Sequence, residues 1–191
     1  MTATTGPGPS APDPAGVPDP GTAAFDALPR ERAAELLLTC CSAPRWARRV
    51  ATRGPHGDLG ALLRACDEEL ARTGEDDVDA ALAGHPRIGE RSASAASSRE
   101  QAAALAADGD VLAALAEGNR AYEERFGHVY LVCASGRSAE DLLATLRARL
   151  GNDPATERAV LRGELAAITR LRVRRLVADL AAGDPVAGGG G

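Results

Sequence analysis

Apolar residues recur at helical spacing along most of the stretch between Phe25 and Leu180. One repeat at intervals of three and four residues, which places its members on one helix face, consists of Leu59, Leu62, Leu63, Cys66 and Leu70. Proline and glycine interrupt these repeats, as at Pro29, Pro44 and residues 53–57. The stretch is rich in Ala, Leu, Arg and Glu, and aromatic residues make up only 3% of the chain. These patterns predict an all-α fold with a single compact multi-helix domain.

The two ends of the chain lack this periodicity. Residues 1–22 consist mainly of Pro, Gly, Ala, Thr and Asp, and the chain closes with a glycine run at residues 188–191. Such composition is typical of disordered segments. The sequence therefore predicts disordered tails at 1–22 and 182–191 around a helical domain at 23–181.

Charge, hydropathy and cysteine spacing exclude several classes of function. The net charge of −5 argues against a nucleic-acid-binding protein. No apolar run reaches the length of a membrane span, and the N-terminus lacks the basic and apolar parts of a signal peptide, so we expect a cytoplasmic protein without a membrane partner. The four cysteines have no paired metal-ligand spacing and are expected to be reduced and mostly buried, with no bound metal.

His85 stands in the run Gly-His-Pro-Arg-Ile-Gly-Glu at residues 84–90. A residue before proline is pushed out of the α region, and glycine commonly ends a helix. We therefore expect a short helix over 76–83 with His85 projecting from its end. Helix C-termini favour positive charge, and histidine titrates near neutral pH, which suits proton transfer. The alternative is an ordinary surface or core histidine.

Ser97 to Gln101 read Ser-Ser-Arg-Glu-Gln. Ser-x-x-Glu is the pattern of a capping box, in which Ser97 starts a helix and Glu100 reaches back to it; the local pattern favours this interpretation. A functional interpretation is compatible with it, because Glu100 and Gln101 at a helix N-terminus present a carboxylate and a carboxamide to a polar ligand.

Arg172 falls on the apolar stripe of the last helix, four residues after Ile168 and four before Leu176. A charge on a buried stripe needs a partner, which is either an acidic residue of a neighbouring helix or an anionic ligand. The other arginines of this region lie off the stripe and are predicted to form a solvated face: Arg170, Arg174 and Arg175.

Residues 129–133 are apolar and β-like by propensity, but one short run does not make a sheet. We predict a buried extended or irregular segment between helices. Its backbone groups must find hydrogen-bond partners, so it can line a small pocket. Tyr122 and Phe126, four residues apart, are predicted to pack in the core.

Taken in order, these motifs resemble the OHCU decarboxylase family, over the stretch from Phe25 to Leu176. The order is His-Pro-Arg-Ile-Gly-Glu, Ser-x-x-Glu-Gln, Asn-x-x-Tyr-x-x-x-Phe-Gly, Cys-Ala-x-Gly-Arg-Ser, Arg-x-Arg-Leu-x-Asn and Ile-Thr-x-Leu-Arg. The family acts on 2-oxo-4-hydroxy-4-carboxy-5-ureidoimidazoline (OHCU), the last unstable intermediate between urate and (S)-allantoin.

The resemblance implies an all-helical, cofactor-independent carboxy-lyase whose partner is this small-molecule substrate. It assigns catalysis to His85, Glu100 and Arg172. The substrate-binding residues that it implies are Pro86, Ser97, Glu100, Gln101, Tyr130, Leu131, Val132, Cys133, Ala134 and Arg172. The substrate carries a carboxylate one carbon from a C=N bond, so its own ring accepts the electrons released with CO2.

Two alternatives stay open at this point. The chain is also compatible with a helical regulatory or protein-interaction domain that uses the arginines at 170–175, or with a related lyase for another ureido acid. Convergence of His85, Glu100 and Arg172 in space distinguishes an enzyme from a structural bundle. A homodimer is allowed as well, because dimers are common among helical enzymes, but no residue identifies an interface.

Overall fold

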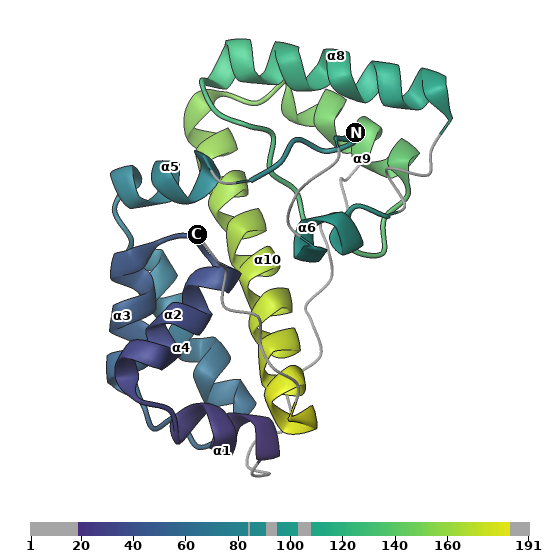
Figure 1. Ribbon diagram of the computed structural model, residues 1–191. Helices are drawn as coiled ribbons and strands as arrows, with labels where there is room; N and C mark the ends of the chain where they lie inside the picture. The colour runs from purple at the N-terminus through teal and green to yellow at the C-terminus, as the bar shows by residue number, and fades with distance from the viewer. Residues whose placement is uncertain (1–18, 84, 91–94, 103–107, 184–191) are drawn as a thin grey trace, which may run out of the picture.

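The computed structural model describes residues 19–83, 85–90, 95–102 and 108–183, and these form nine helices and no strand (Figure 1). The all-α prediction is confirmed. Of the tails predicted at 1–22 and 182–191, residues 1–18 and 184–191 lie outside the described residues. The helices are α1 (Pro20–Asp26), α2 (Arg30–Cys40), α3 (Pro44–Arg53), α4 (Leu59–Ala71), α5 (Glu75–Ala83), α6 (Ala95–Glu100), α8 (Gly109–Phe126), α9 (Ala139–Arg149) and α10 (Pro154–Ala182).

Four of the described helices, α1, α4, α9 and α10, begin after a side-chain cap. Asp58, Ser138 and Asp153 each accept a hydrogen bond from a backbone N–H of the first turn of α4, α9 and α10. Asp19 does the same for α1, which begins at Pro20, inside the segment predicted as a tail. Thr22 is fully buried there. The Asp-Pro pair provides a cap followed by a proline at the first helical position, and this outweighs the disorder-like composition of the surrounding residues.

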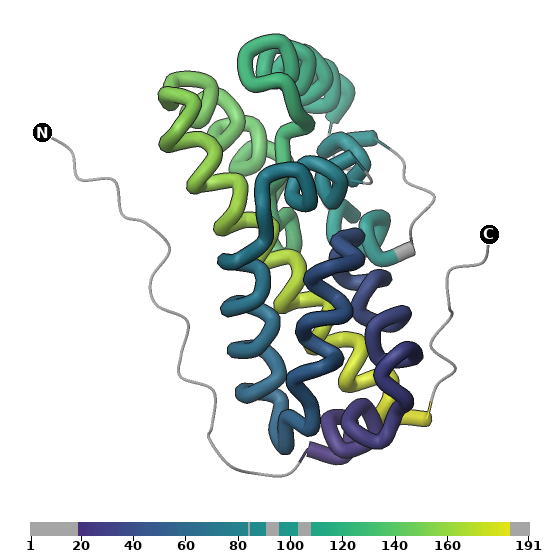
Figure 2. Tube along the Cα trace, turned by 90° about the vertical axis from the view of Figure 1, so that its left-hand side faces the viewer, coloured from purple at the N-terminus to yellow at the C-terminus, as the bar shows by residue number. Residues whose placement is uncertain are grey.

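The 29-residue helix α10 runs through the molecule and is about 43 Å long. Helices α1, α2 and α4 pack against it, and α3 packs between α2 and α4 (Figures 1 and 2). Trp46 is fully buried here, and its Nε1 donates to the carbonyl oxygen of Cys66, 3.0 Å away, which ties α3 to α4.

A second cluster of buried residues lies between α8 and α9, which pack against each other at the other end of the molecule (Figure 1). It contains Ile88 and part of the segment between the two helices, residues 129–134, which forms neither helix nor strand. Tyr130, Leu131 and Val132 are buried, so the predicted buried irregular segment is confirmed. Leu131 belongs to the first cluster and its neighbours to the second, so this segment lies at the junction of the two.

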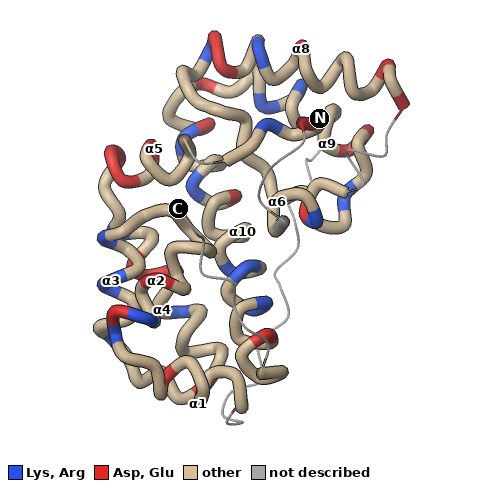
Figure 3. The backbone as a smooth tube through the Cα atoms, viewed as in Figure 1, with Lys and Arg blue, Asp and Glu red and all other residues tan. Residues whose placement is uncertain are grey.

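Helix α5 is attached to α10 by charge. Its first turn is acidic, as the red backbone at one end of α5 shows (Figure 3). Glu75 of this turn pairs with Arg158 and Arg162 of α10, each at 2.5 Å. Its buried side chains Val78 and Leu82 join the first cluster. The ion pairs hold the start of α5, and burial of Leu82 holds the end from which the chain continues to His85. None of the described helices is long and apolar enough to cross a membrane.

Candidate active site

His85 follows the end of α5, as the sequence predicts, because Pro86 stops the helix. Its backbone N–H donates to the carbonyl oxygen of Leu82, 2.9 Å away. Its ring Nδ1 lies 2.8 Å from the carbonyl oxygen of Ala81. Since a carbonyl oxygen only accepts, Nδ1 carries the proton and Nε2 presents its lone pair. The helix end thus orients the ring and selects its tautomer.

Nε2 of His85 is buried and has no hydrogen-bond partner among the residues that the structure describes. Burial lowers the pKa of His85 below 6.5, and the nearby Arg172 charge lowers it further, although the bond to Ala81 acts in the opposite direction. The imidazole is therefore neutral at pH 7. A buried nitrogen with an unused lone pair is a base held ready for a proton.

His85 lines a small cavity at the junction of the two clusters of buried residues. The walls come from the link after α5, from α6, from the segment at 129–134 and from α10. They are formed by His85, Pro86, Ile88, Ser97, Glu100, Gln101, Tyr130, Leu131, Val132, Ala134, Ile168 and Arg172. The structure therefore gathers every predicted site residue except Cys133. The free volume is about 20 Å³, which is room for about one water molecule.

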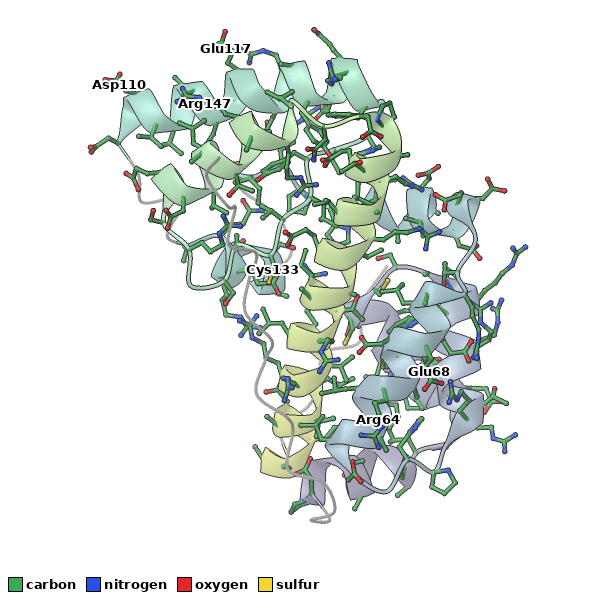
Figure 4. The ribbon with its side chains drawn as sticks, turned by 180° about the vertical axis from the view of Figure 1, so that it is seen from behind. Arg64, Glu68, Asp110, Glu117, Cys133 and Arg147 are labelled. Carbon is green, nitrogen blue, oxygen red and sulfur yellow. The ribbon has the colours of Figure 1, made fainter. Side chains whose placement is uncertain are left out.

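The Cys133 side chain does not line the cavity, contrary to the sequence prediction. Its backbone N–H donates to Glu164 Oε2 at 2.8 Å, so this residue of the segment is turned toward α10. Figure 4 shows Cys133 beside that helix. The side chain is half-buried, and burial raises the pKa of its thiol.

Arg172 and Glu100 form an ion pair at one side of the cavity. Arg172 Nε and Nη2 lie 3.1 and 2.8 Å from the two carboxylate oxygens of Glu100, and Nη2 lies 3.2 Å from Ser97 Oγ. The partner of the arginine on the apolar stripe is thus an acidic residue of another helix. Arg175 also contacts Glu100, at 3.2 Å, and Arg170 pairs with Asp67 of α4. The prediction of a purely solvated face was therefore wrong for both of these arginines, whose side chains are 35% and 33% exposed.

The capping-box interpretation of Ser97 is wrong. Helix α6 begins at Ala95, which places Ser97 inside the helix and Glu100 at its last position rather than near its N-terminus. Two guanidinium groups of α10 hold the Glu100 carboxylate, and charge-assisted bonds of this kind are stronger than a bond to a neutral N–H. The long-range ion pair therefore prevails over the local cap.

Two buried carboxamides hold the turn after His85. Gln101 Oε1 accepts from the N–H of Gly89 at 3.0 Å, and Asn119 Nδ2 donates to the carbonyl oxygen of Ile88 at 2.9 Å. Gly89 has a φ of 84°, a conformation that favours glycine. The positive φ explains why glycine follows Ile88. The backbone of this turn is thereby bonded to Gln101, directly after α6, and to Asn119 of α8.

A buried ion pair behind the cavity was not identified as a site feature from the sequence. Arg149 of α9 donates to Glu157 of α10 at 2.8 and 2.5 Å, and its Nη1 donates to the carbonyl oxygen of Leu131 at 2.8 Å. Tyr122, predicted as a core residue, is fully buried, and its hydroxyl donates to Glu157. A signal was present, because Arg149 continues the apolar positions Ala139, Leu142 and Leu146 at helical spacing.

The described residues contain no group of three or more His, Cys, Asp or Glu side chains placed to hold a metal ion. All four cysteines are free thiols, as expected. Burial raises the pKa of Cys41 to about 11 and that of Cys40 to about 12, so neither is a thiolate at pH 7.

Fold and site together define an all-helical protein with a small cavity that is lined by one neutral imidazole and one arginine–carboxylate pair. Residues 26–174 match the model of the OHCU decarboxylase family, so the chain belongs to this family and the resemblance found in the sequence is confirmed.

The curated relatives are longer than the region over which this chain matches them. The uric acid degradation bifunctional protein TTL of Arabidopsis thaliana is 31% identical over 150 residues, which cover 74% of this chain and 46% of the relative. The 2-oxo-4-hydroxy-4-carboxy-5-ureidoimidazoline decarboxylase of Amia calva is 39% identical over 59 residues, 31% of this chain and 34% of the relative. The chain thus spans less than half the length of either.

Solved structures share the fold. A crystal structure of OHCU decarboxylase in the presence of (S)-allantoin is 27% identical, with a TM-score of 0.69 over 76% of this chain and 99% of that chain. A crystal structure of (S)-allantoin synthase is 15% identical, with a TM-score of 0.64 over 81% of this chain and 53% of that chain, which is a likeness of fold alone.

Proposed function

We propose that this protein decarboxylates OHCU to (S)-allantoin and CO2 in urate degradation, as a carboxy-lyase. The observation that carries the proposal is the buried, unpartnered Nε2 of His85, set in one cavity with Arg172 and Glu100. Membership of the OHCU decarboxylase family supports it. A structural bundle or an interaction domain has no reason to gather these three side chains around a cavity.

The reaction needs an electron acceptor and controlled proton transfer. When the bond between the ring carbon and the carboxylate breaks, its electron pair moves toward the ring C=N bond and CO2 leaves. The ring nitrogen takes up one proton, the ring hydroxyl loses its proton to become a carbonyl, and the neighbouring carbon gains a proton and becomes the stereocentre. The substrate ring accepts the electrons, so the proposal requires neither a cofactor nor a metal.

His85 is the proposed acid–base group. Its neutral Nε2 takes the hydroxyl proton as the carbonyl forms, and the resulting imidazolium returns a proton to one face of the ring. Burial of the ring favours the neutral form before and after this cycle. Because the bond to Ala81 holds the ring orientation, the proton is delivered from a fixed direction, which suits formation of a single enantiomer.

Arg172 and Glu100 are the proposed orienting groups. A guanidinium group binds a carboxylate or a carbonyl through paired N–H donors, whereas a carboxylate accepts from N–H groups such as those of a ureido substituent. Both groups are buried, with side chains 12% and 7% exposed, so their contacts with a ligand are little screened by water. We further propose that the protein is cytoplasmic and has no nucleic-acid or membrane partner. A homodimer is compatible with this function.

The decisive experiment generates the intermediate from urate with urate oxidase and hydroxyisourate hydrolase and follows (S)-allantoin by circular dichroism. We expect the wild-type protein to accelerate formation of this enantiomer. His85→Ala should lower the rate at least about 100-fold, a typical contribution of an acid–base group, with an unchanged far-ultraviolet spectrum. His128→Asn, at a half-buried histidine that does not line the cavity, is the matched control. Racemic product formed at the uncatalysed rate with wild-type protein contradicts the proposal.

A further inference from the structure

The irregular segment at 129–134 supplies one wall of the cavity without a helix or a sheet to hold its backbone. Two of its backbone groups are bonded instead to charged side chains that lie outside the cavity lining. Arg149 Nη1 donates to the carbonyl oxygen of Leu131, and Glu164 Oε2 accepts from the N–H of Cys133, both at 2.8 Å. The two anchored residues flank Val132, which lines the cavity.

Arg149 is itself held in a single position. Its side chain is 6% exposed and pairs with Glu157, which is 0% exposed. Glu157 is fixed in turn by Asn152 Nδ2 at 2.7 Å and by the hydroxyl of Tyr122. The guanidinium group also lies over the Tyr130 ring, 4.9 Å from its centre. One side chain therefore holds the backbone of Leu131 and the ring of Tyr130, two neighbouring parts of the wall.

Stability alone does not account for this arrangement. Desolvation of a buried ion pair offsets much of its attraction, and well-packed apolar side chains of similar size stabilise a core as well or better. What apolar side chains do not supply is a donor in a fixed direction at the Leu131 carbonyl. Glu164 likewise supplies a charged acceptor to a backbone N–H that has no helix or sheet partner.

We propose that Arg149 and Glu164 are positioning residues for the reaction, which together fix the backbone of residues 131–133 against the cavity. The inference rests on the proposed decarboxylase function. A planar ring that reacts on one face needs walls that do not shift, and misplacement by about 1 Å lowers rates by about 100-fold in enzymes that act by orientation. Loosening either anchor therefore lowers kcat and lets the proton reach both faces.

The test uses Glu164→Ala, Glu164→Gln and Arg149→Lys in the full chain. Glutamine keeps an oxygen that accepts from the Cys133 N–H, whereas alanine removes it; lysine keeps the charge of Arg149 but not the fork that reaches both Glu157 and Leu131. Arg147→Lys, on the exposed side of α9, is the control for Arg149. Glu117→Ala, on an exposed position of α8, is the control for Glu164 (both labelled in Figure 4).

We expect Glu164→Ala to lower kcat at least tenfold with KM changed less than threefold, and to lower the enantiomeric excess of (S)-allantoin. Hydrogen exchange of the Cys133 amide should quicken at least tenfold in the same variant. Glutamine should restore most of both losses. Arg149→Lys should lower kcat and enantiomeric excess in the same way, with Arg147→Lys and Glu117→Ala like wild type.

Wild-type kcat and enantiomeric excess in Glu164→Ala would overturn the inference. An equal loss in Glu164→Gln would also overturn it, since the charge rather than the anchored backbone would then matter. If Arg149→Lys does not fold, the two Glu164 variants still decide. A wild-type protein without activity refutes the proposed function, and the amide exchange of Cys133 then reports separately whether Glu164 holds the segment.

Discussion

Replacing Glu100 by glutamine removes the charge that holds two arginines of α10 beside the cavity. Glu100 is 7% exposed, and its partners Arg172 and Arg175 are 12% and 35% exposed. Hydrogen bonds to charged groups contribute about 1.5–3 kcal/mol when buried, whereas a pair as exposed as that with Arg175 contributes about 0–1 kcal/mol. The carboxamide keeps one acceptor oxygen but turns an N–H₂ group toward a guanidinium group. We therefore expect the free energy of unfolding to fall by about 2–3 kcal/mol.

The assay is thermal unfolding followed by far-ultraviolet circular dichroism at pH 7.5. For a chain of this length, 1 kcal/mol corresponds to about 2–4 °C in Tm, so we expect Glu100→Gln to unfold about 4–12 °C below wild type. Glu117→Gln is the control, because Glu117 is exposed and points away from the neighbouring helices in Figure 4. A Tm within about 2 °C of this control would refute the reasoning, since the ion pair would then contribute no net stability.

Three further measurements probe other features. Because burial lowers the pKa of His85 below 6.5, we expect kcat/KM to be constant above about pH 7 and to fall only as the pH drops below 6.5. A kcat/KM that already decreases with falling pH above pH 7 contradicts the assignment of His85 as the base. An added Cβ at Gly163 in α10 meets no atom within 4 Å beyond the adjacent backbone of its own helix, so Gly163→Ala should raise the free energy of unfolding by about 1 kcal/mol in thermal unfolding. At Gly118 the added Cβ would lie 2.6 Å from the buried Leu146 side chain, so Gly118→Ala should show no such gain. Cys133 is half-buried, whereas the other three cysteines are buried. Limited iodoacetamide treatment should therefore label Cys133 first, which peptide mass spectrometry measures. Labelling of Cys41 before Cys133 contradicts this expectation.

The sequence predicted those parts of the site whose structure depends on residues adjacent in the chain. Pro86 excludes His85 from a helix whatever the rest of the fold does, so the position of the imidazole at the end of α5 followed from the sequence. The buried irregular segment followed from its short apolar run between two helices. Arg172 was marked by its place on an apolar stripe, which showed that it needed a partner without showing which one.

Contacts between distant parts of the chain account for what the sequence did not show. Glu100 pairs with Arg172, 72 residues away, and the local capping pattern does not compete with this largely buried guanidinium group. The tautomer of His85 depends on how the helix end turns its ring. Arg149 and Glu157 each stand on the apolar stripe of their helix, as Arg172 does. The same rule, applied to every helix, would have marked both residues as charges that need a partner, without showing that they pair with each other.

The order of the helices along the chain has a consequence for the newly made protein. Helices α8 and α9 are neighbours in sequence and pack on each other, so they can associate as soon as both have left the ribosome. Helices α1, α2 and α4 bury their apolar faces against α10, which is synthesised after all of them. The cavity takes Ile168 and Arg172 from the same helix. The cavity is therefore completed in the step that closes the core. A chain interrupted before α10 exposes apolar surface that chaperones and proteases recognise.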